Sequence, residues 1–302
     1  MTDSSKTASA RWGAERRLEL IDFRLRWEGR VNRAELVDFF GISVQQASSD
    51  IASYMGRAPQ NIYYDKQAKT YRTAESFTTL FEGNDAALYL SQLADLASGV
   101  ASPPARFIGW QPPCDVVRYP TRPVSDASLL RLLQAIRDAN EVEVTYQSMR
   151  RQNVAVRWIS PHSLASDGLR WHVRAWCHES ADFRDFVLSR IMEISDSRPT
   201  TVDPRADRDW HTHVEVRVRP RPGLSRSQRV AIEADFGMTQ GSLAIRCRRA
   251  LAFYVVRQLH LDRPEDLPIA EQPLELENRA ELADVLQKAR KCPDVEAYQQ
   301  SS

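Results

Sequence analysis

The chain has 302 residues, of which 42% are hydrophobic and 27% are charged, and a chain of this size and composition usually folds into two or three soluble domains. Its formal net charge is only +1, so any affinity for nucleic acid must come from a local basic surface. No stretch approaches the roughly 18 apolar residues of a membrane span, and residues 1–10 lack the apolar core of a signal peptide, so we expect a cytoplasmic protein.

Cysteine usage argues against two further classes of protein. The four cysteines are widely separated, and none belongs to a C-x-x-C pair. This spacing favours neither a disulfide framework nor a structural zinc site. We therefore expect reduced thiols in the core, no metal and no cofactor. The four residues are Cys114, Cys177, Cys247 and Cys292.

Two helices with clear boundaries are predicted near the N-terminus. Apolar residues recur at helical spacing over residues 14–28, which predicts the first helix. Asn32 and Glu35 form a capping-box pattern at the start of a second helix over residues 33–40. Gly41 should end that helix, because glycine tolerates the positive φ of a helix C-terminus.

A third helix should begin after Ser43, its N-cap, and run to about Met55. Helical spacing divides this helix into two faces. The inward face is expected to comprise Val44, Ala47, Ile51 and Tyr54. The outward face is expected to comprise Gln45, Gln46, Ser48, Ser49 and Ser53.

Two short β-type runs follow, at residues 62–65 and 70–72, and they flank a basic tip, Lys66–Lys69. This pattern predicts a β-hairpin. Two helices joined by a short glycine-containing turn are typical of DNA-reading elements, and a hairpin after them completes a winged helix. We therefore expect a winged helix-turn-helix domain over residues 1–73.

A helical, proline-rich linker is predicted over residues 74–125. Residues 74–100 carry apolar side chains at helical spacing, and the prolines at 103, 104, 112 and 113 then break the chain. A short strand is expected at residues 116–119.

The next domain is predicted over residues 126–200. It opens with a helix over residues 128–139, capped by Asp126 or Ser128. Hydrophobic residues then alternate with a period of two in four runs separated by turn residues, which predicts a small antiparallel sheet or barrel. The runs begin at Val142, Val154, Trp171 and Phe186.

The last domain is predicted over residues 201–302, after a proline-rich joint. Its pattern predicts a strand at 214–218, a helix at 225–236, a strand at 243–247 and a helix at 251–261. This order describes a small α+β domain, so the whole chain is expected to be an α+β multidomain protein.

Four segments of the middle domain carry a resemblance to a known family. They are Val144-Thr145-Tyr146, Ile159-Ser160-Pro161-His162, Arg170–Ala175 and Phe186–Ile191. Together with the N-terminal helices and the α+β tail, their order and spacing resemble the WYL-domain transcription regulators, and among these the BrxR/CapW-type repressors found beside phage-defence systems. The Trp-Tyr-Leu triplet that names the domain reads Trp171-His172-Val173 here.

The resemblance implies three modules over nearly all of the chain. The central one would be a small, SH3/Sm-like WYL β-barrel that senses a ligand, and the C-terminal one would be a dimerisation domain. The implied function is that of a homodimeric, DNA-binding transcriptional repressor that controls a phage-defence operon.

The outward face of the third helix is the candidate DNA-reading surface. In a winged helix this helix enters the major groove, and the wing contacts the DNA backbone. Gln45 and Gln46 suit adenine because a carboxamide donates and accepts at once. Ser48 and Ser49 are short enough to let the helix sit deep, and Ser53 lies on the same face. Candidate phosphate contacts are Arg11, Arg16, Arg17, Arg57, Lys66 and Lys69.

One such domain makes too small an interface for operator-level affinity. We therefore expect a homodimer on an inverted-repeat operator of double-stranded DNA, with half-sites about 34 Å, or a multiple of this, apart. The alternative is that the polar residues of the third helix form only a solvated surface and that the hairpin tip is an ordinary turn.

A candidate ligand patch lies in the middle domain. Strand alternation places Arg170, His172 and Arg174 on one face, where three basic side chains should face solvent or an anion such as a nucleotide or a nucleic-acid end. The full candidate set, most of which the family resemblance assigns to the ligand site, is Tyr146, Ser148, His162, Arg170, His172, Arg174, Ser189 and Arg190. The alternative is an internal salt-bridge network with acidic residues, of which the candidates are Asp167, Glu179, Asp182 and Asp185.

Other classes of function are weaker fits to the sequence. His162, Ser163 and Asp167 are close in sequence, but no G-x-S-x-G motif or metal-ligand cluster accompanies them, so we do not expect an enzyme. A sensor acting on a protein or RNA partner stays open, as does activation in place of repression. Our working hypothesis is that a ligand shifts the relative pose of two winged helices, which requires that it bind one pose more tightly.

Overall fold

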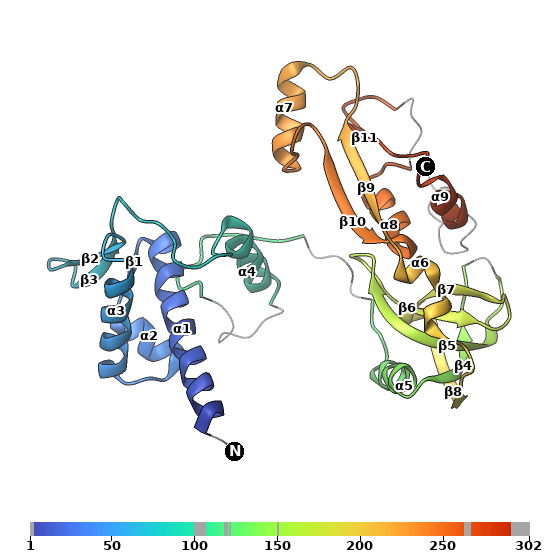
Figure 1. Cartoon of the computed structure of the whole chain (residues 1–302), viewed down its shortest axis with the longest axis horizontal. Coiled ribbons are helices and arrows are strands. Elements are labelled where there is room, and N and C mark those ends of the chain that lie inside the picture. The colour runs from blue at the N-terminus through green and yellow to red at the C-terminus, as the bar shows by residue number, and fades with distance from the viewer. Residues whose placement is uncertain are drawn as a thin grey trace. The chain divides into compact units, whose positions relative to one another are not determined.

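The computed structural model describes residues 3–99, 107–117, 120, 122–149, 151–262 and 267–290, with side chains from residue 12 to residue 287 of these. The chain divides into two compact units, residues 1–119 and 120–302, which are coloured blue to green and green to red in Figure 1. Among the described helices, none is both long enough and apolar enough to cross a membrane.

Unit 1 contains four helices and a small sheet in the described residues. The helices are α1 (Asp3–Glu28), α2 (Arg33–Phe40), α3 (Val44–Arg57) and α4 (Ala86–Ser98). The strands β1 (Arg30–Val31), β2 (Ile62–Asp65) and β3 (Thr70–Thr73) form an antiparallel sheet in the order β1-β3-β2. This is the winged helix-turn-helix expected from the sequence, with β2 and β3 as the wing.

The boundaries of α2 and α3 arise from local capping. The Asn32 side chain accepts from the backbone N–H of Glu35, whose carboxylate accepts from the Asn32 backbone, so the capping box is complete. Gly41 ends α2 with a φ of 64°, a conformation that glycine adopts without steric cost. Ser43 caps α3 by accepting from the Gln46 N–H. These predictions are confirmed.

The core of unit 1 forms where α1 packs against the buried face of α3. Helix α1 contributes Leu18, Ile21 and Leu25 to it. Ala47, Ile51 and Tyr54 of α3 are buried as predicted. Val44 is not, because it lies at the first turn of α3 with 58% of its surface exposed.

The segment after the wing contains less helix than the sequence predicts. Helix α4 begins only after Asp85, which caps it, and residues 74–85 form turns and irregular backbone. Residues 116–117 lie outside any strand, so the short strand expected at 116–119 is wrong in its described half. Residues 118–119 lie outside the described residues.

Unit 2 begins with α5 (Asp126–Arg137) and a five-stranded antiparallel sheet. The N-cap of α5 is Ser125, whose side chain accepts from the Ser128 N–H. The caps predicted at Asp126 or Ser128 were therefore placed too late in the sequence. The strands run in the order β7-β6-β5-β4-β8. They are β4 (Asn140–Tyr146), β5 (Ala155–Ser166), β6 (Trp171–Cys177), β7 (Asp182–Val187) and β8 (Ile191–Pro199).

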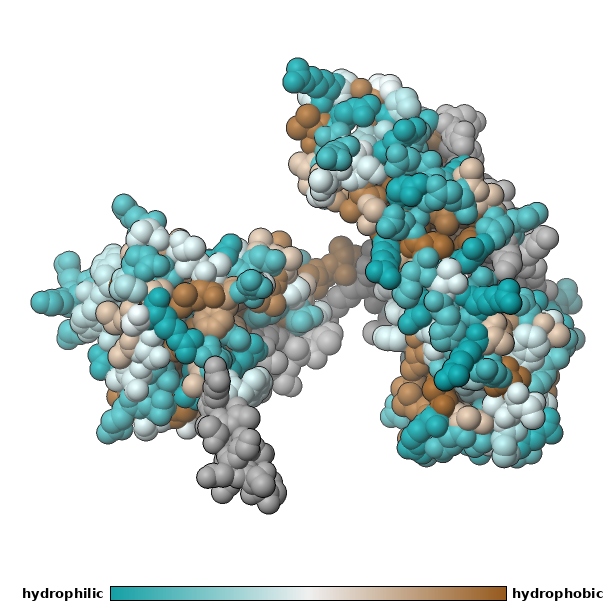
Figure 2. All heavy atoms as spheres, viewed as in Figure 1, coloured by the Kyte–Doolittle hydropathy of each residue, from teal (hydrophilic) through white to brown (hydrophobic). Residues whose placement is uncertain are grey.

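Helix α5 covers one face of this sheet, where Leu132 and Ala135 join its core. The other side of α5 exposes Leu130 and Leu133, and Figure 2 shows hydrophobic surface in the region of α5. A 3-10 turn, Leu188–Arg190, joins β7 to β8. The predicted run from Phe186 therefore ends as a strand at Val187.

The rest of unit 2 is a smaller α+β module. It follows the predicted order with β9 (His213–Pro220), α7 (Arg226–Asp235), β10 (Leu243–Arg248) and α8 (Ala252–Gln258). Two further α-helices and one strand of the described residues were not predicted: α6 (Arg208–His211), α9 (Ala283–Arg290) and β11 (Leu274–Leu276). The sheet order is β10-β9-β11, and Val216 and Val218 of its central strand are fully buried.

Candidate functional site

The polar side chains predicted for the outward face of α3 are mostly exposed. Gln45, Gln46, Ser49 and Ser53 are exposed, and Ser48 is half-buried. The Ser48 hydroxyl donates to the Val44 carbonyl at 2.9 Å, so part of its hydrogen-bonding capacity is already used within the helix. The other four predicted residues stand on the surface as the helical spacing requires.

A buried carboxylate anchors the back of this helix. Asp22 of α1 is fully buried and accepts hydrogen bonds from the Tyr54 hydroxyl (2.6 Å), the Asn84 amide (2.9 Å) and the backbone N–H of Leu80 (3.0 Å). Thr79 adds a fourth donor at 2.5 Å. Burial, together with the hydrogen bond to Asp22, raises the pKa of Tyr54. Asp22 therefore ties α3 and the segment after the wing to α1.

Sequence reasoning missed Asp22. The available signal was its place between Ile21 and Phe23 in an otherwise apolar part of α1. A charged residue among core positions needs several hydrogen-bond partners to be tolerated.

Three of the predicted phosphate contacts form ion pairs within unit 1. Arg16 pairs with Glu19 at 2.9 Å and Arg57 pairs with Glu15 at 2.7 Å. Arg17 pairs with Asp50 of α3 at 2.6 Å and is mostly buried, so Arg17 is held in the domain rather than presented at its surface. The side chain of Arg11 lies outside the described part of the chain.

The wing tip is exposed, and its backbone is fixed. Lys66 and Lys69 are both exposed, and the surface over the hairpin is mostly hydrophilic in Figure 2. Asp65 accepts from the N–H groups of Gln67 and Ala68, at 2.9 Å each, and pairs with Arg72. The Ala68 hydrogen bond and these other contacts lower the pKa of Asp65. The tip thus presents its two lysines from a hydrogen-bonded turn.

In unit 2, the prediction that the basic side chains of Arg170, His172 and Arg174 face solvent is wrong. His172 and Arg174 retain only 2% and 7% of their surface, and Arg170 is half-buried. Arg170 pairs with Asp167 at 2.9 Å. The anionic partners of these basic side chains are therefore carboxylates of the protein itself.

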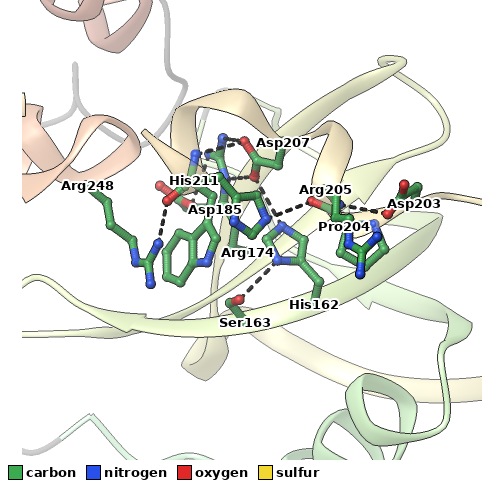
Figure 3. A network of polar contacts seen from close by, with 11 residues as sticks. His162, Ser163, Arg174, Asp185, Asp203, Pro204, Arg205, Asp207, His211 and Arg248 are labelled. Carbon is green, nitrogen blue, oxygen red and sulfur yellow. Dashed lines mark hydrogen bonds and ion pairs between the residues drawn. The ribbon is translucent and has the colours of Figure 1, made fainter. Parts of the chain in front are cut away.

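Arg174 is the centre of this network (Figure 3). Its guanidinium donates to both oxygens of Asp207, at 2.7 and 3.0 Å, and to Asp185 at 3.2 Å. Burial opposes the charged form of Arg174, but these two carboxylates outweigh it and raise the pKa of Arg174. Asp207 also caps α6 through the Trp210 N–H.

His162 joins the same carboxylate from β5. Its Nε2 lies 3.1 Å from Asp207, and its Nδ1 lies 3.0 Å from the Ser163 hydroxyl. Burial alone would raise the pKa of Asp207, but hydrogen bonds from His162 and Arg174 outweigh it and hold that pKa well below its usual range.

The internal salt-bridge alternative is therefore correct for Asp167 and Asp185. Glu179 pairs instead with Arg151 and Arg157. The main carboxylate, Asp207, was not anticipated. Its sequence signal is an aspartate three residues before the buried Trp210, which is the spacing of a helix N-cap.

The remaining predicted patch residues gather where β4 ends. The backbone N–H of Gln147 donates to the Arg190 carbonyl at 3.2 Å, so the two segments that carry Ser148 and Arg190 lie side by side. The Tyr146 hydroxyl accepts from the Val187 N–H at 3.3 Å. Ser148 and Tyr146 are buried, and Ser189 is exposed.

The network also reaches the smaller α+β module. Tyr254 of α8 donates to the second oxygen of Asp185 at 3.0 Å. Its ring lies 5.2 Å from that of His172, measured between centroids. Asp185 therefore connects Arg174 of the five-stranded sheet directly to a helix of the C-terminal module.

Three family models match this chain in succession. The winged helix-turn-helix domain of BrxR transcriptional regulators matches residues 13–95, the WYL domain matches residues 127–195, and the C-terminal dimerization domain of BrxR matches residues 213–282. A curated relative from Pseudomonas aeruginosa, the DNA-binding transcriptional repressor CapW, is 43% identical over 95% of this chain and 100% of its own length. The chain belongs to the BrxR/CapW family of transcriptional regulators.

Further members of the BrxR/CapW family agree with this assignment. The CapW repressors of Stenotrophomonas maltophilia and Escherichia coli are each 39% identical over 95% of this chain, and the matches cover 97% and 96% of their own lengths.

Among solved structures, proteasome accessory factor B/C of Arthrobacter aurescens matches over 96% of this chain and 49% of its own chain. The two sequences are 19% identical, and the TM-score is 0.26.

Unit 2 also contains a Ser-His-Asp series of contacts between β5 and the N-cap of α6, which bears on the enzyme alternative. Ser163, His162 and Asp207 touch in that order. However, Asp207 is engaged by two hydrogen bonds from Arg174 and by the N-terminus of α6, which is the pattern of a structural ion network. Among the described residues, no cluster of three His, Cys, Asp or Glu side chains could hold a metal ion.

Proposed function

We propose that the protein is a cytoplasmic, homodimeric transcriptional repressor that binds an inverted-repeat operator in double-stranded DNA. The observation that carries this proposal is the exposed polar face of α3, held on α1 by the buried Asp22 and flanked by a hydrogen-bonded basic wing. Relatives that span the whole chain are named DNA-binding transcriptional repressors, which supports the same reading.

Within this proposal, α3 enters the major groove. Gln45, Gln46 and Ser49 contact base edges near the start of the helix, with Ser48 and Ser53 on its flanks. Lys66 and Lys69 contact phosphates from the wing. Arg11, Arg16 and Arg57 are further phosphate contacts, and Arg16 and Arg57 would exchange a half-buried glutamate partner for a phosphate.

The test is footprinting of the full-length protein on the DNA upstream of its own coding region. We expect two protected half-sites related by a two-fold axis and separated by about 34 Å or a multiple of it. Changing Gln45, Gln46 and Ser49 together to alanine should abolish protection, whereas Gln134→Ala on the exposed side of α5 should not. Protection that survives the triple change would exclude α3 as the reading helix.

We further propose that an anionic effector, a nucleotide or a nucleic-acid end, binds the WYL domain and relieves repression of a phage-defence operon. Ser189, which is exposed, and Arg190 beside it would receive the anion first, because Arg174 is buried and pairs with Asp207 and Asp185. An anion that reaches Arg174 competes with these carboxylates and so loosens the connection to Tyr254. The effector thereby favours a different pose of the C-terminal module.

Titration of nucleoside phosphates and short oligonucleotides into the operator complex tests the effector proposal. At least one should bind the WYL domain and lower operator affinity, and Arg190→Ala should weaken that binding. If every compound that binds leaves operator affinity unchanged, the effector mechanism is wrong, while the DNA-binding proposal is unaffected.

A further inference from the structure

Asp50 lies directly behind one of the proposed base-reading residues. It is one turn after Gln46 on α3, and only 5% of its surface is exposed. Its Oδ1 accepts from Nε2 of Gln46 at 3.0 Å and from Nη2 of Arg17 at 3.3 Å, and its Oδ2 accepts from Nε of Arg17 at 2.6 Å. Arg17, Asp50 and Gln46 thus form a chain of contacts from α1 to the exposed face of α3.

This arrangement restricts the orientation of the Gln46 side chain. An ionised carboxylate accepts hydrogen bonds and cannot donate them, so only the NH₂ end of the carboxamide can face Asp50. The two N–H bonds of the NH₂ group differ, because one lies on the side of Oε1 and the other on the side of Cγ. We take Asp50 to hold the N–H on the side of Cγ, so that the remaining N–H and Oε1 form a donor–acceptor edge that points away from it.

A donor beside an acceptor is the pattern that recognises adenine in the major groove, where N7 accepts and the N6 amino group donates. A glutamine with no fixed partner can rotate its carboxamide and present the two groups in the opposite order. The contact with Asp50 removes that freedom before DNA arrives, which lowers the entropic cost of making the contact.

We propose that Asp50, held by Arg17, is a positioning residue that fixes the Gln46 carboxamide and thereby sets the preference for adenine at one base pair of each half-site. This inference rests on the proposed role of α3 in reading DNA. It also gives Arg17 a function other than phosphate contact. Its guanidinium compensates a buried carboxylate that would otherwise be costly to bury and would repel the DNA backbone.

The variant that tests the proposal is Asp50→Asn. Asparagine has the same shape but offers both a donor and an acceptor, so Gln46 can then face it in either orientation. We expect the adenine preference at one base pair to fall by about tenfold, at the same position that Gln46→Ala affects, with the other positions unchanged. Asp50→Glu keeps an acceptor-only group and should restore the preference.

Selection from an operator library with every base at every position, performed with full-length protein, measures these preferences. Asp50→Asn also removes one negative charge, which strengthens binding to all sequences alike. Asp38→Asn on the exposed side of α2 is the matched control, because it makes the same charge change away from Gln46. It should leave the preference at every position as in the wild type.

The outcomes separate this inference from the proposed function. If Gln46→Ala loses the adenine preference and Asp50→Asn retains it, Asp50 does not position Gln46. If Gln46→Ala changes no preference while the operator is still bound, the inference fails and DNA binding stands. A wild-type protein with no preference among double-stranded sequences would instead overturn the proposed function. If Asp50→Asn does not fold, Asp50→Glu alone tests the inference. Loss of the adenine preference in a folded Asp50→Glu variant would then overturn it.

Discussion

Each unit contains a buried carboxylate that accepts hydrogen bonds from several donors. Asp22 accepts from Tyr54, Thr79, Leu80 and Asn84, and Asp207 accepts from His162, Arg174 and Trp210 in the same way. In each case the carboxylate joins segments that are far apart in sequence. Loss of such an acceptor leaves several buried donors without a partner, which costs more than one hydrogen bond contributes.

For Asp22 this predicts a large local effect. Asp22→Ala should lower the free energy of opening α3 by about 3 kcal/mol, because the buried Tyr54 hydroxyl and the other donors lose their acceptor. Tyr54→Phe removes a single donor and should cost about 1 kcal/mol. Hydrogen exchange of α3 amides in the full-length protein measures both. Equal losses in the two variants would contradict the central role of Asp22.

For Asp207 the effect depends on pH. Its pKa is lower in the folded protein than in the unfolded chain, so its contribution to stability is full above the unfolded value and is lost as pH falls through the folded one. Asp207→Asn should therefore be less stable than the wild type at pH 7, and the difference should shrink below about pH 4.

Urea unfolding between pH 7 and pH 3 measures this difference. Asp138→Asn is the control, because Asp138 is exposed and solvent screens its pair with Arg137. It should change stability little at any pH. A difference between Asp207→Asn and wild type that stays constant over this range would show that the ionised carboxylate is not what stabilises the network.

At the scale of elements, the sequence predicts structure well where the signal is local. The capping box at Asn32 and Glu35 spans one helical turn, and Gly41 follows it directly, so α2 and the start of α3 were predicted to the residue. The β6 strand shows the opposite case. Its alternation predicted exposed basic side chains, but Val173 packs in the sheet core while Arg174 lies beneath α6. A strand covered on both faces has no exposed side for alternation to identify, and the Asp207 that covers it is 33 residues away.

The turn between α2 and α3 allows a prediction at this scale. Gly41→Ala places a Cβ on a residue with a φ of 64° and should destabilise unit 1 by about 1 kcal/mol, since that conformation is strained for alanine. Gly56→Ala is a matched control inside α3, where an added Cβ meets nothing within 4 Å and alanine is the better helix former. It should stabilise the protein slightly. Thermal unfolding distinguishes the two, and a stabilising Gly41→Ala would contradict the assigned turn.

At the scale of the whole molecule, the proposed effector mechanism requires the five-stranded sheet and the C-terminal module to move as coupled parts. The contacts of unit 2 proposed to carry this coupling are those of Asp185, which Arg174 and Tyr254 share, and of Asp207, which caps α6. The sequence indicated the order of the modules through its alternating periods. It could not indicate their connection, because ion pairs between modules leave no periodic pattern.

The proposed homodimer makes the distance between half-sites a property of the whole molecule. Inserting about 5 bp between the half-sites turns them to opposite sides of the duplex, since one helical turn is about 10.5 bp. Operator affinity should then fall by about tenfold or more, because one winged helix of each dimer loses its site. Inserting about 10 bp restores the facing of the half-sites and changes only their separation, so recovery of affinity measures how far the dimer can stretch. The same insertions outside the half-sites should have no effect, and unchanged affinity with 5 bp between them would mean that each subunit binds its half-site independently.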